Sequence, residues 1–262
     1  MNFISDTNAK SVLRGIIKTA IMETPMMAEV EAKLKQVQSL WPNMSKMRSV
    51  LTEYAKPWAL YSNIAIIKET VETFKTFSLE WVMMEFVETD KGWQIKIRSV
   101  NYTRHNDSQL LVKGQRPTIT IYGHALERLF QRGRIITWPE VRKAIFETMS
   151  TTYQIWSNCD ADIHQIVTWS ELGAFVGYME EMTDNGCGAH YAKRNIVLKT
   201  FYSDRVMNEK VKRVRQHMMI HMAKHYKKYP SSYGPFNQAA WLQDVRKYHS
   251  WMCEPPKLSE EE

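Results

Sequence analysis

Apolar residues within the first 77 positions recur every three or four residues, which is the spacing of amphipathic helices. Val12, Leu13 and Ile16 lie in a first predicted helix, which is expected to end near Pro25. Three more helices are predicted at residues 27–40, 47–54 and 58–77. Because these segments contain no cluster with catalytic spacing, we expect them to brace the rest of the chain or to form the interface with a protein partner.

From residue 79 the pattern changes to that of β-strands. Residues 93–100 alternate apolar and polar side chains, as a half-buried strand does, and residues 81–87 precede them across a short turn containing Gly92. This arrangement predicts a β-hairpin. Residues 101–116 are expected to form a polar loop or a short strand with turns. Further strands are predicted at residues 118–122, 163–169, 173–179 and 195–202.

Two helices are predicted directly after the strand at residues 118–122. Helical spacing begins at His124 and ends at Gly133, a residue that suits a helix C-terminus. Thr137 and Glu140 have the spacing of a capping box, which predicts a second helix from there to Met149. The prediction is therefore a helix pair inserted between strands.

A long basic helix is predicted from about residue 205 to residue 229, capped by Ser203 or Asp204. Its apolar side carries Val211, Val214 and Met218. Basic residues of this segment are predicted to contact nucleic-acid phosphates: Arg205, Lys210, Lys212, Arg213, Arg215, Lys224, Lys227 and Lys228. The alternative is that they form a solvated face. The segment after this helix is expected to be a tail with a flexible end.

Because strands and helices are segregated along the chain, the predicted fold class is α+β with a mainly antiparallel sheet, not a doubly wound α/β sheet. The expected organisation is a helical region at residues 1–78, an α+β domain at 79–203, and the basic helix with its tail at 204–262.

His124, Arg128 and Arg132 recur every four residues and so share one side of their predicted helix. A neutral imidazole can accept or give a proton near pH 7, and arginines hold phosphate oxygens with paired hydrogen bonds. The combination suits phosphodiester chemistry. The alternative is that His124 caps a turn and that the arginines are solvated.

The chain carries a net charge of +7, which favours a polyanionic partner such as nucleic acid. It has no run of about 18 apolar residues, so no membrane span is expected. The first residues lack the apolar core and cleavage site of a signal peptide, and an intracellular, cytoplasmic protein is therefore predicted.

Neither a metal ion nor a cofactor is predicted. One candidate zinc site combines Cys187 and His190, which have C-x2-H spacing, with Cys159 and His164. Because the second pair is not tightly spaced, the pattern is a weak indication of zinc. Three histidines recur at four-residue steps: His217, His221 and His225. Because no H-E-x-x-H pattern accompanies them, the preferred interpretation is a stripe that faces solvent or a polyanion.

The segment Gly123–Gly133, G-H-A-L-E-R-L-F-Q-R-G, resembles small bacterial domains of unknown function marked by H-A-x-E-R-x3-R-G. Those domains are similar to the barnase, EndoU, colicin and RelE group of metal-independent ribonucleases, in which helices precede a four-stranded antiparallel sheet. The resemblance covers residues 117–203, including the capped helix and the strand at 195–202.

The resemblance implies that His124 is the motif histidine and that Arg128 and Arg132 are its arginines, while Thr200 and Tyr202 match the threonine and tyrosine of its last strand. It implies cleavage of RNA by its own 2′-hydroxyl, with His124 as general acid or base and Glu127 as a second proton carrier. RNA is a more natural partner than DNA for such a site. The alternative is a non-catalytic phage or mobile-element protein that binds nucleic acid or a host or virion protein.

Overall fold

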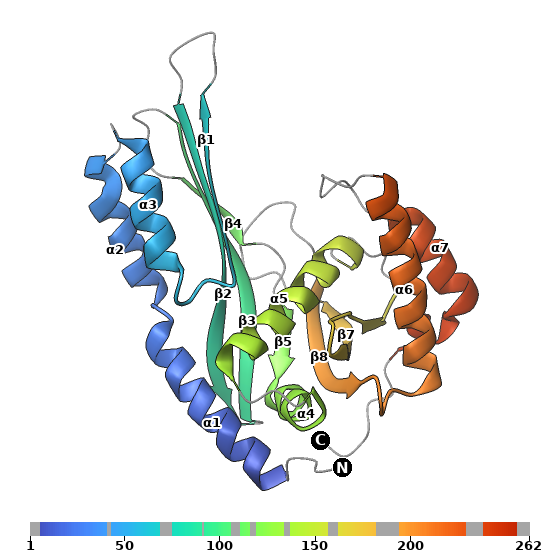
Figure 1. Cartoon of the computed structure of the whole chain (residues 1–262). Coiled ribbons are helices and arrows are strands. Elements are labelled where there is room, and N and C mark those ends of the chain that lie inside the picture. Colours follow the sequence, from blue (N-terminus) through green and yellow to red (C-terminus); the bar gives the residue numbers. More distant parts are fainter. Residues whose placement is uncertain are drawn as a thin grey trace.

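The computed structural model describes residues 6–40, 43–68, 75–90, 92–105, 111–115, 119–133, 137–156, 162–181, 194–228 and 238–255 (Figure 1). The helices are α1 (Asp6–Glu23), α2 (Met27–Val37), α3 (Met44–Ala55), α4 (Gly123–Gly133), α5 (Trp138–Ile155), α6 (Glu209–Lys228) and α7 (Gln238–Tyr248), with 3-10 helices η1 (Gln38–Leu40) and η2 (Ser250–Cys253). The strands are β1 (Tyr61–Lys68), β2 (Lys75–Thr89), β3 (Gly92–His105), β4 (Leu111–Gln115), β5 (Ile119–Tyr122), β6 (Gln165–Val167), β7 (Gly173–Glu181) and β8 (Arg194–Ser203).

All the strands belong to one sheet with the order β1-β2-β3-β5-β8-β7-β6, and β4 pairs with a separate stretch of β3. Every neighbouring pair is antiparallel except β5 and β8, which run parallel. Along the chain, the helices and the strands occur in separate blocks: α1–α3, β1–β5, α4–α5, β6–β8 and α6–α7. The predicted α+β class with a mainly antiparallel sheet is therefore confirmed.

The predicted hairpin is confirmed as β2 and β3, and both strands are longer than expected. Thr89 and Gly92 pair across the turn, and the Thr89 hydroxyl donates to the Gly92 carbonyl oxygen at 2.7 Å. Gly92 has a φ of 99°, a left-handed conformation that glycine adopts without steric cost. The turn residues therefore determine the register of the longest strand pair.

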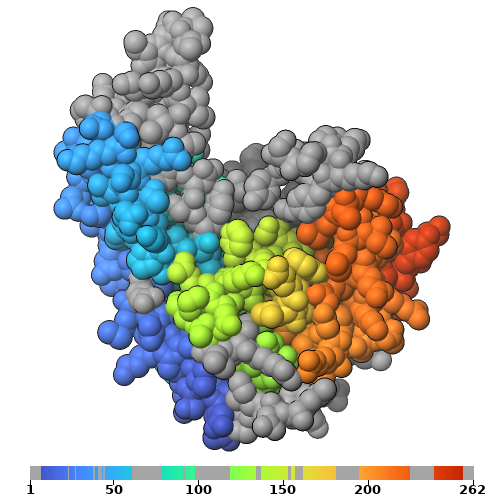
Figure 2. Space-filling view, viewed as in Figure 1, coloured from blue at the N-terminus to red at the C-terminus, as the bar shows by residue number. Residues whose placement is uncertain are grey.

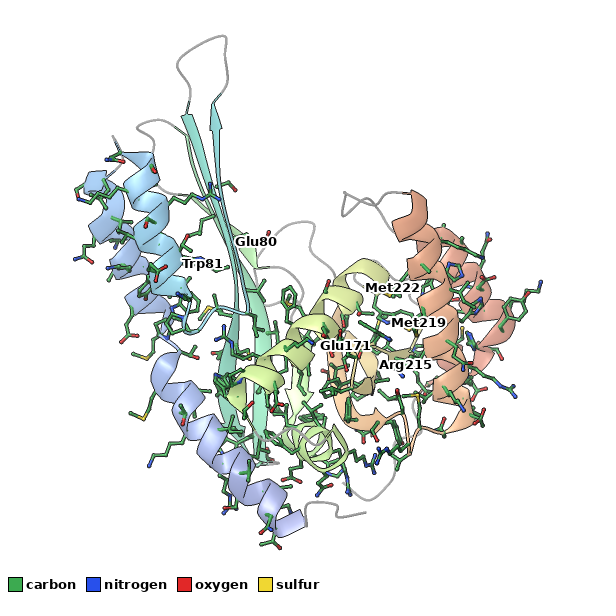
Figure 3. All side chains as sticks on the ribbon, viewed as in Figure 1. Glu80, Trp81, Glu171, Arg215, Met219 and Met222 are labelled. Carbon is green, nitrogen blue, oxygen red and sulfur yellow. The ribbon has the colours of Figure 1, made fainter. Side chains whose placement is uncertain are left out.

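Strand β2, which lies between β1 and β3, is buried on both faces over residues 81–84. Val82 and Met84 pack into the core formed with α1, α4 and α5, while Trp81 and Met83 pack against α2 and α3. Figure 3 shows Trp81 on the side of the sheet that faces α3. A strand covered on both sides needs consecutive apolar residues, and this explains the uninterrupted run from Trp81 to Met84.

Three predictions about single elements are wrong: the type of one, the start of another and the absence of a third. The helix expected at residues 58–77 is absent from the described part of that segment, where β1 pairs antiparallel with β2. The basic helix begins at Glu209, because Asn208 Oδ1 accepts from the Val211 N–H at 2.9 Å and caps it in place of Ser203 or Asp204. The tail contains helix α7, which was not predicted.

Candidate functional site

Helix α4 follows strand β5 without an intervening residue, and this places His124 in the first helical turn. A Cβ atom on Gly123 would lie 2.8 Å from the Trp93 carbonyl oxygen, so the junction requires a glycine. Ala125, Leu126, Leu129 and Phe130 are fully buried and hold α4 against β8. The opposite side of the helix is thereby turned outward, and the His124 side chain is 56% exposed.

His124 contacts two charged neighbours on its own helix. Arg128 Nε donates to His124 Nε2 over 3.5 Å, which is a long hydrogen bond, and His124 Nδ1 lies 3.9 Å from Glu127 Oε2. Arg128 Nη1 also donates to Gln131 Oε1 at 2.7 Å. The imidazole therefore lies between a guanidinium and a carboxylate.

Arg132 joins this helix to strand β8. Its Nη1 donates to the Phe201 carbonyl oxygen at 2.7 Å, and its guanidinium carbon lies 5.4 Å from the centre of the Tyr202 ring. Thr200 is half-buried two residues earlier on β8, where it pairs with Val176 of β7. Of the two predicted site residues on β8, Tyr202 is therefore placed against Arg132 of α4.

The electrostatics of the cluster favour a neutral imidazole. Burial lowers the pKa of His124, and the positive charge of Arg128 lowers it further, whereas Glu127 acts in the opposite direction. Burial and then Arg128 also lower the pKa of Arg132, a group that stays charged near neutral pH. At pH 7 the site therefore combines an unprotonated histidine with two guanidiniums.

Replacing Arg128 with glutamine should raise the pKa of His124, because the change removes a positive charge beside the ring. The matched change Glu127→Gln should lower it, because a negative charge is lost. An NMR titration of the His124 ring protons measures both shifts. Equal shifts in one direction for the two variants would contradict this account of the site.

Five of the predicted phosphate-contacting residues of the basic segment are exposed: Arg205, Lys210, Lys212, Arg213 and Lys224. Arg205 lies in the turn before α6, not in the helix itself. Lys212 Nζ lies 3.5 Å from Glu209 Oε1, with which it forms an ion pair. The side chains of Lys227 and Lys228 lie outside the described residues.

Arg215 corrects the prediction for this helix. Its side chain is only 13% exposed, it forms an ion pair with Asp204, and its Nη2 donates to the Ser170 carbonyl oxygen at 3.0 Å. Figure 3 shows it directed from α6 toward the sheet. Arg215 therefore holds α6 in place and is not a surface ligand for phosphate.

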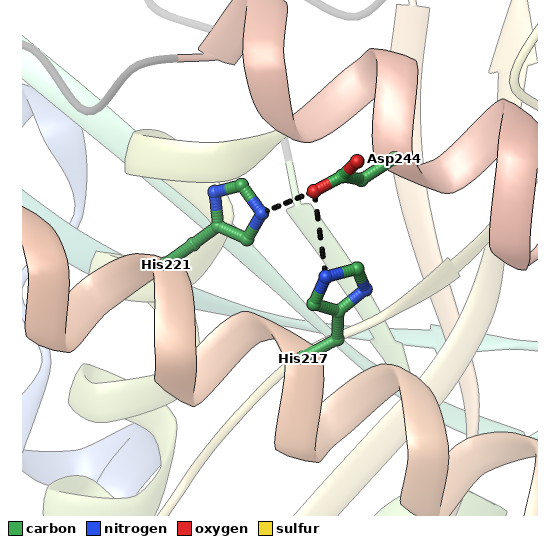
Figure 4. A group of neighbouring side chains, drawn as sticks. All are labelled: His217, His221 and Asp244. Carbon is green, nitrogen blue, oxygen red and sulfur yellow. Dashed lines mark hydrogen bonds and ion pairs between the residues drawn. The ribbon is translucent and has the colours of Figure 1, made fainter.

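The predicted histidine stripe facing solvent or a polyanion is wrong for its first two members. His217 and His221 of α6 both direct Nε2 toward Oδ2 of Asp244 on α7, at 3.4 and 2.8 Å (Figure 4). The side chain of His225 lies outside the described residues. Asp244 was missed because α7 was not predicted, although Trp241, Leu242 and Val245 have helical spacing.

Of the sequence-based zinc set, only His164 is described; Cys159, Cys187 and His190 lie outside the described residues. Comparisons with protein-family models, curated proteins and solved structures yield no match. Among the described helices, none has the length and apolar character needed to cross a membrane.

Proposed function

We propose that the protein binds RNA at α4 and cleaves it without a metal ion. The observation that carries this proposal is the placement of His124, half-exposed and beside Arg128, on the outward side of a helix that also carries Arg132. The lowered pKa of His124 suits a general base at neutral pH. The two guanidiniums match the geometry and charge of a phosphate group.

In the proposed reaction His124 takes the proton of the 2′-hydroxyl, and the 2′-oxygen forms a bond to the adjacent phosphorus. The bond from phosphorus to the 5′-oxygen breaks, and the leaving oxygen takes a proton from water. The Glu127 carboxylate, beside His124 Nδ1, is the candidate second proton carrier, which takes the proton from the imidazolium and so returns His124 to its neutral form. Arg128 and Arg132 stabilise the negative charge of the pentacoordinate phosphate. Tyr202, held against Arg132, offers a ring on which a base can stack.

A basic surface formed by Arg205 in the turn before α6 and by Lys210 and Arg213 of α6 extends this site. Arg205 follows Tyr202 by three residues, and the exposed Lys210 and Arg213 lie in the first turns of α6. Figure 1 shows α4 near the end of β8, from which the chain turns into α6. A single strand of RNA that reaches the α4 site can therefore continue along these cations.

Changing Arg205, Lys210 and Arg213 to glutamate should weaken RNA binding for every sequence tested. Three lost phosphate contacts should also reduce the slope of log affinity against log salt concentration by about 2. Fluorescence anisotropy with a labelled single-stranded RNA across a salt series measures both. Arg215 is left unchanged because its substitution would disturb the contacts of α6 with Asp204 and Ser170.

The matched control changes Lys35, Lys46 and Arg48 to glutamate. These residues are exposed on α2 and α3, on the opposite side of the molecule from α6 (Figures 1 and 2). Their substitution changes the net charge by the same amount as the first triple variant. The control should reduce affinity far less. Equal losses in the two triple variants would show a response to net charge alone and would contradict a binding surface at α6.

A further inference from the structure

We propose that His217, His221 and Asp244 bind a Zn²⁺ ion between α6 and α7, independently of the RNA site. The two histidines are four residues apart and project from one side of α6 toward the carboxylate of α7 (Figure 4). Their ligand atoms all lie within 4.8 Å of one another. Two imidazoles and one carboxylate are a ligand set found in zinc sites that keep a fourth position for water.

The distances suit a tetrahedral ion. With bonds of about 2.0–2.1 Å, neighbouring ligand atoms around Zn²⁺ are about 3.3 Å apart. His217 Nε2 and Asp244 Oδ2 are 3.4 Å apart, and His221 Nε2 lies 2.8 Å from the same oxygen. All three ligand atoms lie within 4.8 Å of one another, so no pair has to change its separation by more than about 1.5 Å to accommodate the ion.

The surroundings already orient the rings as ligands. His217 Nδ1 lies 3.1 Å from His249 Nε2, so a proton on Nδ1 can be donated to His249 and leave the Nε2 lone pair directed at the site. The buried Trp241 packs edge-on against the rings of His217 and His221, with centroids 5.8 and 5.3 Å apart. These contacts restrict both imidazoles to the face that meets Asp244.

The site is enclosed but accessible. The side chains of His217, His221 and Asp244 are 23%, 11% and 33% exposed. Nitrogen ligands favour zinc over magnesium or calcium, which prefer oxygen alone. An ion held by both helices would fasten α7 to α6, so metal binding should also stabilise the folded chain.

The test uses the full chain, freed of metal by a chelator and dialysis, and titrated with Zn²⁺ against a chromophoric competitor. One equivalent should bind, and the unfolding temperature should rise with it. His221→Ala and Asp244→Asn should each weaken binding at least about tenfold. His249→Ala, which removes the partner of His217, should weaken it by about tenfold.

Cys187→Ser and His124→Ala are the controls, because neither residue belongs to the proposed ligand set; both should bind Zn²⁺ as the unchanged chain does. If a ligand variant fails to fold by circular dichroism, zinc X-ray absorption of the unchanged protein decides. Nitrogen and oxygen ligands at about 2.0–2.1 Å, including two imidazoles, support the site. Sulfur ligation, or unchanged affinity in folded His221→Ala and Asp244→Asn, would overturn it and leave a hydrogen-bonded histidine–aspartate cluster.

Discussion

Replacing His124 with alanine should slow RNA cleavage by at least about a hundredfold, because the change removes the group that takes the 2′-hydroxyl proton. Arg128→Ala should cost a similar factor, since the guanidinium stabilises charge that develops only in the transition state. Rates are measured under single-turnover conditions on a labelled RNA. His164→Ala is the matched histidine control and should cleave at the unchanged rate.

The ends of the RNA products and the effect of a chelator on the rate test the same mechanism. Attack by the neighbouring hydroxyl leaves 2′,3′-cyclic phosphate ends, and a substrate with a 2′-deoxy residue at the cleaved position should resist. A chelator should leave the rate unchanged at temperatures well below unfolding, because the proposed zinc site serves stability and lies on α6 and α7. The rate should rise with pH as His124 loses its proton, with the midpoint below the ordinary histidine value of about 6.5.

Two outcomes would replace the mechanism. Purified protein that binds RNA with the expected salt dependence but leaves it intact supports the non-catalytic alternative, a binding protein built on the same surface. Cleavage abolished by chelator and restored by Zn²⁺ would move the chemistry from His124 to a metal. Whether such an ion is the one between α6 and α7 is decided separately, because Zn²⁺ binding by the His221→Ala and Asp244→Asn variants is measured without RNA.

Gly177→Ala should lower the free energy of unfolding by about 3 kcal/mol or more. Gly177 lies in β7 at a register shift against β8, and a Cβ there would be 1.8 Å from the Val197 carbonyl oxygen. That atom is main chain in the neighbouring strand, so the clash is relieved only by separating the strands. Urea unfolding followed by circular dichroism measures the loss.

The control for this change is Gly15→Ala. Gly15 lies inside α1, where an added Cβ meets nothing within 4 Å. Alanine is favoured over glycine in a helix interior by about 1 kcal/mol, so this variant should be as stable as the original chain or more stable. A Gly177→Ala protein that unfolds at the same urea concentration as the original would show that β7 and β8 pair in another register.

The elements predicted correctly from the sequence depend on contacts between residues close in the chain. The start of α5 is an example, because Glu140 Oε2 accepts from both the N–H and the hydroxyl of Thr137, three residues away. The turn at Gly92 determines the hairpin in the same way. His124, Arg128 and Arg132 share one side of α4 because helical periodicity alone places them there.

Tertiary structure decided what depends on distant partners. Residues 61–68 form a strand because the long β2 offers them an edge to pair with, and their own spacing was also compatible with a helix. Arg215 fixes α6 against the rest of the chain because it contacts Asp204 and the Ser170 carbonyl oxygen. In the sequence nothing distinguishes it from the exposed basic residues beside it. His217 and His221 meet Asp244 only because α7 packs on α6, and side-chain spacing within one helix carries no information about the residue that faces it.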